Sequence, residues 1–165
     1  VMTRLRVHGK GSDKYDNVRI GLNARLDTMQ AAILLEKLAI FGDEIEKRNG
    51  VANRYTEALS ASNQITCPSV PQGLVSSWAQ YTVRLDPSKR DAISAALKAK
   101  GVPTVVYYPR PLHEQTAYRH FPGASNLAAS SRLAKEVLSL PMHPYLTGEN
   151  QNKVCEALLD AVAAA

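Results

Sequence analysis

The chain has 165 residues, of which 45% are hydrophobic and 21% charged. This composition excludes a disordered or fibrous protein, and the length favours one domain with a hydrophobic core. No apolar run approaches the roughly 18–20 residues of a membrane-spanning helix, so we expect no membrane segment.

The formal charge of +5 is concentrated near the amino-terminal end, where bases outnumber acids over residues 1–25. A basic surface favours an anionic partner such as phosphate or carboxylate, and the alternative is an ordinary solvated face. Because no lysine-rich run occurs and no aromatic residues alternate with the bases, we do not expect nucleic-acid binding. The chain opens in mid-pattern with Val1 rather than Met, which suggests a piece of a longer polypeptide.

Near the start of the chain, residues 5–8 are predicted as a short strand. Alternation along it would bring Arg4, Arg6 and His8 to one face. An edge strand with solvated bases is the alternative interpretation.

A long helix is predicted over residues 27–60. Asp27 and Gln30 form a capping-box pair, and apolar residues then recur every three or four positions. Such a helix would span roughly 50 Å, more than the diameter of a small domain. We therefore expect it to link two lobes or to cross a subunit interface, with Gly42 or Gly50 as possible bend points.

The remaining elements alternate between strand and helix, which predicts a small α/β or α+β lobe. They are a strand over 78–85, a helix capped by Ser88 and Asp91 and ending at Lys100, a strand over 103–108, a helix over 127–138, a short strand over 138–141 and a helix from Thr147 to about 163.

The two cysteines, Cys67 and Cys155, lie far apart and have no CxxC partner or histidine cluster. We therefore expect no metal site and no disulfide framework, which fits a reducing cytoplasm. Cys155 is interpreted as a small buried hydrophobic residue.

Two segments carry side chains suited to an anionic, oxygen-rich ligand. Asn23 and Arg25 lie two positions apart at the start of the long helix, where an amide and a guanidinium can converge on an anion. A polar loop is the alternative there. Tyr107 and Tyr108 end a predicted strand and His113 follows it, where ligand-contacting residues often lie. The alternative is an extended connector whose tyrosines cover the core.

Taken together, six sequence strings resemble the DegT/StrS family of sugar aminotransferases, which are pyridoxal-phosphate (PLP) enzymes of fold type I. The strings are RVHG at 6–9, GLNARLDTMQAAIL at 21–34, AQYTVR at 79–84, GVPT at 101–104, YPRPL at 108–112 and LSLPMHP at 138–144. The resemblance covers less than half of such an enzyme, its carboxy-terminal portion. It is closest to the branch that aminates the 3-keto group of a UDP-linked, N-acetylglucosamine-derived uronic acid for bacterial surface polysaccharide.

The resemblance implies a three-part organisation. Residues 1–26 would be the tail of the large cofactor-binding domain, 27–60 a long interdomain helix and 61–165 a small α/β domain. The Schiff-base lysine, the aspartate facing the pyridine nitrogen and the ring-stacking aromatic would all precede this chain. None of its nine lysines lies in an apolar context that would lower an amine pKa, so we expect no transamination by the chain alone.

The resemblance also implies roles for individual residues. Asn23 would reach across a homodimer to the cofactor phosphate of the neighbouring subunit, and Arg25 would help to hold the phosphate or substrate. Arg6 and His8 would lie near the sugar-nucleotide channel. These are binding roles, and no catalytic residue is assigned within the chain.

Three further residues would lie beside the substrate. Tyr107 and Tyr108 fall where many family members have His-Tyr, so Tyr107 keeps a hydrogen-bond donor but loses a titratable imidazole. His113 aligns with a position that varies between His and Asn.

The implied reaction moves an amino group, probably from glutamate, through PLP to a nucleotide-linked 3-keto sugar. The implied partners are the missing amino-terminal half, a second subunit and the sugar nucleotide. Alternatives are another nucleotide keto-sugar, a dehydratase relative in which His replaces the lysine, and a non-catalytic binding or dimerisation lobe of the same fold.

Overall fold

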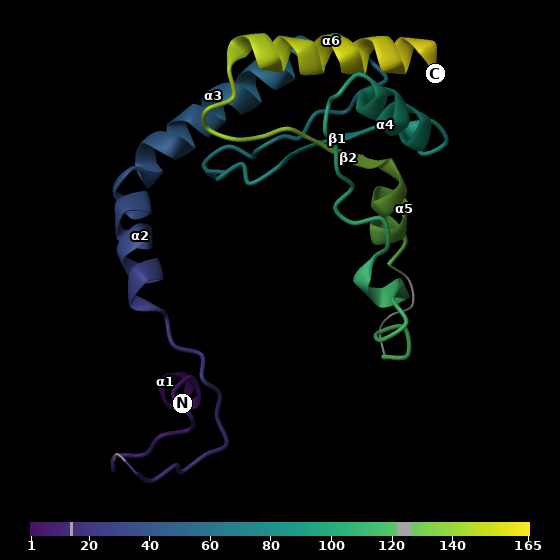
Figure 1. The fold of residues 1–165 in the computed structure, drawn as a ribbon. Coiled ribbons are helices and arrows are strands. Elements are labelled where there is room, and N and C mark those ends of the chain that lie inside the picture. The colour runs from purple at the N-terminus through teal and green to yellow at the C-terminus, as the bar shows by residue number, and fades with distance from the viewer. Residues whose placement is uncertain (14, 122–126) are drawn as a thin grey trace. The chain divides into compact units, whose positions relative to one another are not determined.

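The structure is a computed structural model that describes residues 1–13, 15–121 and 127–165. The chain divides into two compact units, Val1–Gly42 and Asp43–Ala165 (Figure 1). The division into 1–26, 27–60 and 61–165 stays a prediction about the domains of the whole enzyme.

The first unit begins with a short helix, α1 (Met2–Leu5), so the predicted strand over 5–8 is wrong. Of the expected strand only Val7 pairs, in a single antiparallel bridge to Asn23. Because the backbone is helical up to Leu5 and has a positive φ of 59° at His8, the side-chain alternation of a strand does not arise.

Helix α2 (Thr28–Ala39) starts where its capping residue predicts. The Asp27 carboxylate accepts hydrogen bonds from the backbone N–H of Met29 at 2.9 Å and of Gln30 at 3.3 Å. No residue of α2 is buried, although apolar residues surround much of the helix. These apolar residues therefore form no core within the chain by itself.

The predicted helix over 27–60 is interrupted. Helix α2 ends with Ile40 as its C-cap, and α3 (Phe41–Leu59) begins at the next residue. The break lies two residues before Gly42, one of the two predicted bend points, while Gly50 is inside α3.

The second unit contains a two-stranded antiparallel sheet of β1 (Tyr81–Arg84) and β2 (Val137–Leu140). Tyr81 pairs with Leu140 and Arg84 with Val137. The strand predicted over 103–108 is reduced to one bridge, between Val105 and Ser139.

Helices α4 (Arg90–Ala99), α5 (Ala128–Glu136) and α6 (Gly148–Ala164) complete the second unit, and α4 packs against α6 and β2. A single turn of 3₁₀ helix, η1 (Leu112–Glu114), precedes α5. The Thr147 hydroxyl accepts from the Asn150 N–H at 3.3 Å, as the predicted capping requires.

A buried core joins α3, β1, β2 and α6. Tyr55 and Tyr81 are fully buried, with their ring centroids 4.9 Å apart. The Tyr55 hydroxyl donates to the Pro141 carbonyl at 2.9 Å, and the Tyr81 hydroxyl lies 2.7 Å from that of Thr56. Burial raises the pKa of both tyrosines, so both stay neutral hydrogen-bonding groups.

A polar bridge at the centre of this core joins α3 to α6. Gln151 is 2% exposed, and its amide nitrogen donates to the Val51 carbonyl at 2.7 Å. Its amide oxygen accepts from the Arg54 Nε at 2.7 Å. Both ends of a buried amide are thus satisfied, which fixes the register of the two helices.

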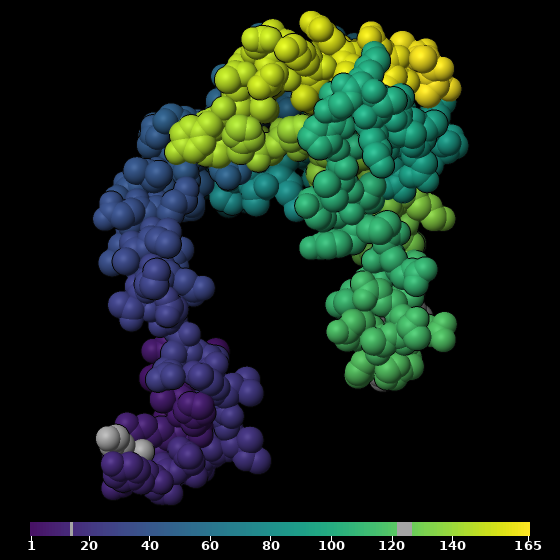
Figure 2. All heavy atoms as spheres, in the orientation of Figure 1, coloured from purple at the N-terminus to yellow at the C-terminus, as the bar shows by residue number. Residues whose placement is uncertain are grey.

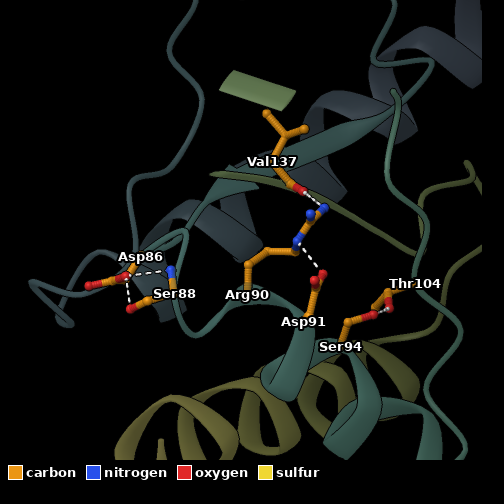
Figure 3. A network of polar contacts seen from close by, with 7 residues as sticks. All are labelled: Asp86, Ser88, Arg90, Asp91, Ser94, Thr104 and Val137. Atoms are coloured by element: carbon orange, nitrogen blue, oxygen red, sulfur yellow. Dashed lines mark hydrogen bonds and ion pairs between the residues drawn. The ribbon is translucent and has the colours of Figure 1, made fainter. Parts of the chain in front are cut away.

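The start of α4 differs from the predicted capping box (Figure 3). Ser88 donates from its backbone N–H and hydroxyl to Asp86 rather than capping the helix. The guanidinium of Arg90, which is 8% exposed, instead reaches back to the Val137 carbonyl at 3.3 Å and has its Nε 2.8 Å from Asp91 Oδ1. The Nε–Asp91 contact is an ion pair without a well-aligned hydrogen bond.

The sequence predicts neither a membrane-spanning helix nor a metal site, and the structure describes residues 1–13, 15–121 and 127–165 for this comparison. No helix there combines the length and apolar character that crossing a bilayer requires. Nor do these residues bring together three or more potential metal-ligating side chains. Cys67 and Cys155 are both free, and Cys155 is buried as expected.

Candidate functional site

Two backbone segments of the first unit cross closely before α2 begins. The His8 N–H donates to the Leu22 carbonyl at 3.0 Å, and the Leu22 N–H donates to the Leu5 carbonyl at 2.8 Å. The Ala24 N–H donates to the Arg6 carbonyl at 2.9 Å. We call residues 5–9 and 19–24 the crossing; its hydrogen bonds hold the backbone on both sides of Asn23.

Asn23 and Arg25 meet at this crossing. The Arg25 Nε lies 3.0 Å from the Asn23 Oδ1 and donates to it. Because the amide oxygen is used in this bond, the Asn23 amide N–H₂ and the two terminal nitrogens of Arg25 remain as donors toward a ligand. Both residues are exposed, and no carboxylate partner of Arg25 is found within the described part of the chain.

The start of α2 contributes less to this site than the sequence suggests. The Asp27 carboxylate already occupies the N–H groups of Met29 and Gln30. An incoming anion would have to displace a negative charge there, so an anion bound at this site would be held by Asn23 and Arg25 rather than by the helix terminus. A planar guanidinium with a neighbouring amide is a donor set that fits a phosphate group.

Arg6 and His8 are both exposed and belong to the same unit as Asn23. Arg6 is the C-cap of α1, and its carbonyl accepts from Ala24 in the crossing. Since there is no strand here, the predicted common face of Arg4, Arg6 and His8 does not exist. Arg6 and His8 are joined to the Asn23 segment through their backbone.

A pocket of about 900 Å³ lies in the second unit, between the 107–121 segment and α5. It brings together the three site residues predicted there, Tyr107, Tyr108 and His113. The other lining residues are Arg110, Pro111, Leu112, Gln115, Tyr118, Phe121, Leu127, Ser130, Leu133, Ala134 and Val137. The wall is thus largely apolar and aromatic, with a few polar groups that could orient a ligand.

The two tyrosines contribute differently to the pocket. Their rings meet edge to face, with centroids 5.6 Å apart. Tyr107 is 42% exposed and Tyr108 is 71% exposed, so both can offer a hydroxyl to a ligand without breaking a core contact. The interpretation that they only cover the core is therefore wrong.

His113 is held within the fold. Its side chain is only 14% exposed, and Nε2 lies 3.3 Å from the Ser131 hydroxyl of α5 and 3.6 Å from Glu114 Oε1. The Ser131 hydroxyl also donates to Glu114. These contacts fasten η1 to α5 and leave His113 as a wall residue of the pocket. Sequence reasoning missed Ser131 and Glu114, and their spacing from His113 carries no signal of this contact.

The described lysines give no candidate for a Schiff base. None is buried, and Lys14 lies outside the described residues. A hydrogen bond from Lys47 to Asp43 raises the pKa of the Lys47 amine, opposite to the shift that a nucleophilic lysine needs.

Comparisons with known proteins give a consistent result. The profile of the DegT/DnrJ/EryC1/StrS aminotransferase family matches residues 1–159. The chain is 44% identical over 151 residues to the UDP-2-acetamido-2-deoxy-3-oxo-D-glucuronate aminotransferase of Pseudomonas aeruginosa, covering 92% of this chain and 40% of that protein. It spans a similar share of the other curated relatives.

Solved structures agree with the sequence relatives. A DegT DnrJ EryC1 StrS aminotransferase from Brucella abortus is 48% identical, with a TM-score of 0.89, over 97% of this chain and 42% of that one. NtdA from Bacillus subtilis, solved with bound cofactor PMP, is 27% identical with a TM-score of 0.86, over 97% of this chain and 38% of that one. These matches cover nearly the whole chain and agree with the predicted α/β fold and with the resemblance. The chain belongs to the DegT/DnrJ/EryC1/StrS aminotransferase family.

Proposed function

We propose that this chain is the carboxy-terminal portion of a PLP-dependent aminotransferase that acts on a nucleotide-linked 3-keto sugar. The amino donor would be an amino acid, glutamate in our proposal, and the product would serve surface polysaccharide synthesis. The 44% identity to an enzyme named for a UDP-linked 3-oxo-glucuronate supports this class of substrate. Another nucleotide keto-sugar is the alternative within the family.

The observation that carries the proposal is the Asn23–Arg25 pair. Its hydrogen bond joins the Arg25 Nε to the amide oxygen, which leaves the amide N–H₂ and the other guanidinium nitrogens as donors on an exposed, basic segment. These donors suit the phosphate of PLP, whose charge would otherwise cost free energy on leaving water. When bound, the cofactor would supply the electron sink for amino transfer. The pair would hold its phosphate across the interface of a homodimer.

The second unit would contribute to sugar binding. Tyr107 and Tyr108 line the pocket and are exposed, so they would offer hydroxyl groups to a ligand, and the exposed Arg110 would add a positive charge suited to a carboxylate or diphosphate. Tyr107 would hydrogen-bond the ligand through its phenol hydroxyl. His113 would shape the wall. Arg6 and His8 would line the approach of the sugar nucleotide.

The rest of the enzyme would come from a missing amino-terminal portion. Two observations support this: the chain spans about 40% of its curated relatives, and none of its described lysines is buried. Helix α2 supports it independently, because a helix that is apolar around much of its circumference is normally buried by other protein. We therefore propose that the chain alone does not transaminate.

The test is amino transfer by the whole polypeptide that contains this chain. Incubation with ¹⁵N-glutamate and a UDP-linked 3-keto uronic acid should place ¹⁵N on the sugar. Arg25→Ala should raise the apparent dissociation constant for PLP by about tenfold or more, the loss of hydrogen bonds to a charged group. Arg19→Ala removes a nearby exposed arginine as the matched control. Equal effects of the two variants, or no labelled sugar, would refute the proposal.

A further inference from the structure

Two glycines occupy the points where the crossing is tightest. A Cβ placed on Gly9 would lie 1.7 Å from the Arg19 carbonyl oxygen, and one on Gly21 would lie 2.2 Å from the Gly9 nitrogen. All the atoms it would meet are backbone atoms, which cannot swing away as a flexible side chain can. Any residue larger than glycine must therefore push the two segments apart.

The two glycines act for different reasons. Gly9 has a φ of 78°, a left-handed conformation that other residues adopt only with strain, in addition to its lack of space. Gly21 has no such backbone demand, so its requirement is the close approach alone. Replacing Gly21 by Ala therefore tests the spacing of the crossing without a change in preferred φ.

The spacing matters because the anion-binding pair is attached to it. Asn23 is the residue that pairs with Val7, and the N–H groups of its neighbours Leu22 and Ala24 bond across the crossing. These backbone contacts hold the main chain at Asn23, and the side-chain bond to Arg25 holds its amide. Both side chains are exposed, so packing in a core does not hold them and their position depends on these contacts.

We propose that Gly9 and Gly21 are positioning residues: the close crossing that they permit sets the geometry in which Asn23 and Arg25 bind a phosphate group. This inference rests on the proposed function of the pair. It adds that affinity for the phosphate depends on backbone spacing at residues that do not themselves touch the ligand.

The test is an NMR titration, with inorganic phosphate, of the PLP-free whole polypeptide that contains this chain, following the Asn23 side-chain N–H₂ and the Arg25 Nε–H. The four samples are the parent chain, Gly21→Ala, Arg25→Ala and Gly42→Ala. Gly42 lies in the first turn of α3, and a Cβ there meets nothing within 4 Å, so it is the matched control. The nuclear Overhauser contact between Val7 and Asn23 reports the crossing without ligand.

We expect saturable shifts in the parent chain and in Gly42→Ala. In Gly21→Ala the Val7–Asn23 contact should be lost and the phosphate dissociation constant should rise about tenfold, as for the loss of one hydrogen bond to a charged group. The signals of the second unit should be unchanged, because its core lies in a separate unit. Gly9→Ala should behave in the same way, so two variants examine the same crossing.

The outcomes separate the two ideas. Loss of binding in Arg25→Ala together with parent-like binding in Gly21→Ala would overturn the positioning role and leave the proposed site standing. Loss of the Val7–Asn23 contact with unchanged phosphate affinity would overturn it as well. No saturable shift in the parent chain, or none lost in Arg25→Ala, would overturn the phosphate role of the pair and the inference with it.

Discussion

The apolar surface of α2 makes a quantitative prediction about assembly. Its large side chains remain strongly exposed in this chain: Met29 76%, Ile33 63%, Leu34 54%, Leu35 68% and Leu38 68%. In the view of Figure 2, the blue spheres of this helix are visible on the surface. At ~1.5–3 kcal/mol for fully burying each such side chain, covering this exposed fraction would contribute roughly 5–10 kcal/mol. That is enough to drive tight association.

Leu34→Asp is the perturbation that separates an exposed position from an interface position. In the chain alone the substitution should change the free energy of unfolding by no more than about 0.5 kcal/mol, because Leu34 is not part of a core. In the assembled enzyme it removes about 1 kcal/mol of apolar burial and adds the desolvation of a carboxylate, for a loss of at least ~3 kcal/mol. Assembly should weaken more than about 100-fold.

Thermal unfolding of the chain and sedimentation velocity of the whole enzyme measure the two effects. Gln30→Asp, which adds the same charge to a polar, exposed position of α2, is the control. A large drop in the unfolding temperature of the chain alone would refute the interpretation, since it would mean that Leu34 is already buried there. Unchanged assembly together with unchanged stability of the Leu34→Asp enzyme would refute it equally.

Three further predictions concern the second unit. Tyr55→Phe should cost about 1–3 kcal/mol in urea unfolding, because it leaves the Pro141 carbonyl without its buried donor; an unchanged midpoint would contradict this hydrogen bond. Burial, reinforced by the charge of Cys67, raises the pKa of the Cys155 thiol to about 11. Iodoacetamide should therefore modify the half-buried Cys67 long before Cys155. The stability that the protonated Cys155 thiol contributes is complete below its ordinary pKa of 9.0 and should be lost as the pH rises through about 11. Hydrogen bonds from Ser88 lower the pKa of Asp86, so this carboxylate stabilises the fold above its ordinary pKa and loses that effect as the pH falls through the lowered value. Ser88→Ala should raise the pKa of the Asp86 carboxyl, as measured by an NMR titration. An unchanged titration would rule out the Ser88 hydroxyl as a cause.

Elements with local signals were predicted best. The Thr147 cap and the final helix, and the strand that became β1, follow from residues within a few positions of one another. Their outcome depends little on distant parts of the chain. The same is true of the Asp27 cap of α2.

The errors occur where distant residues decide the structure. Whether 5–8 and 103–108 become strands depends on a partner strand, and each finds only a one-residue bridge. Ser88 has a capping pattern, but the carboxylate of Asp86 attracts its donors instead. The apolar pattern of α2 could not show what would cover this helix, and none of its residues is buried within the chain.

The candidate site was predicted in part for a physical reason. Their residue types indicated Asn23 and Arg25 as candidates, and their separation by two positions brings them into hydrogen-bonding contact. The spacing could not reveal that Asp27 closes the helix terminus. Nor could it indicate that Ser131 would hold His113, because that contact joins residues on separate elements.

Subunit mixing tests the cross-subunit role of Arg25 most directly. A whole enzyme lacking its Schiff-base lysine, which is inactive, would be combined with one carrying Arg25→Ala at a PLP concentration too low to load the Arg25→Ala enzyme, and the subunits allowed to reassort. If Arg25 serves the neighbouring subunit's cofactor, each mixed dimer has one intact site and amino transfer should return to roughly a quarter of the parent activity, since about half of the dimers are mixed. If no activity returns, Arg25 serves only its own subunit and the account is contradicted.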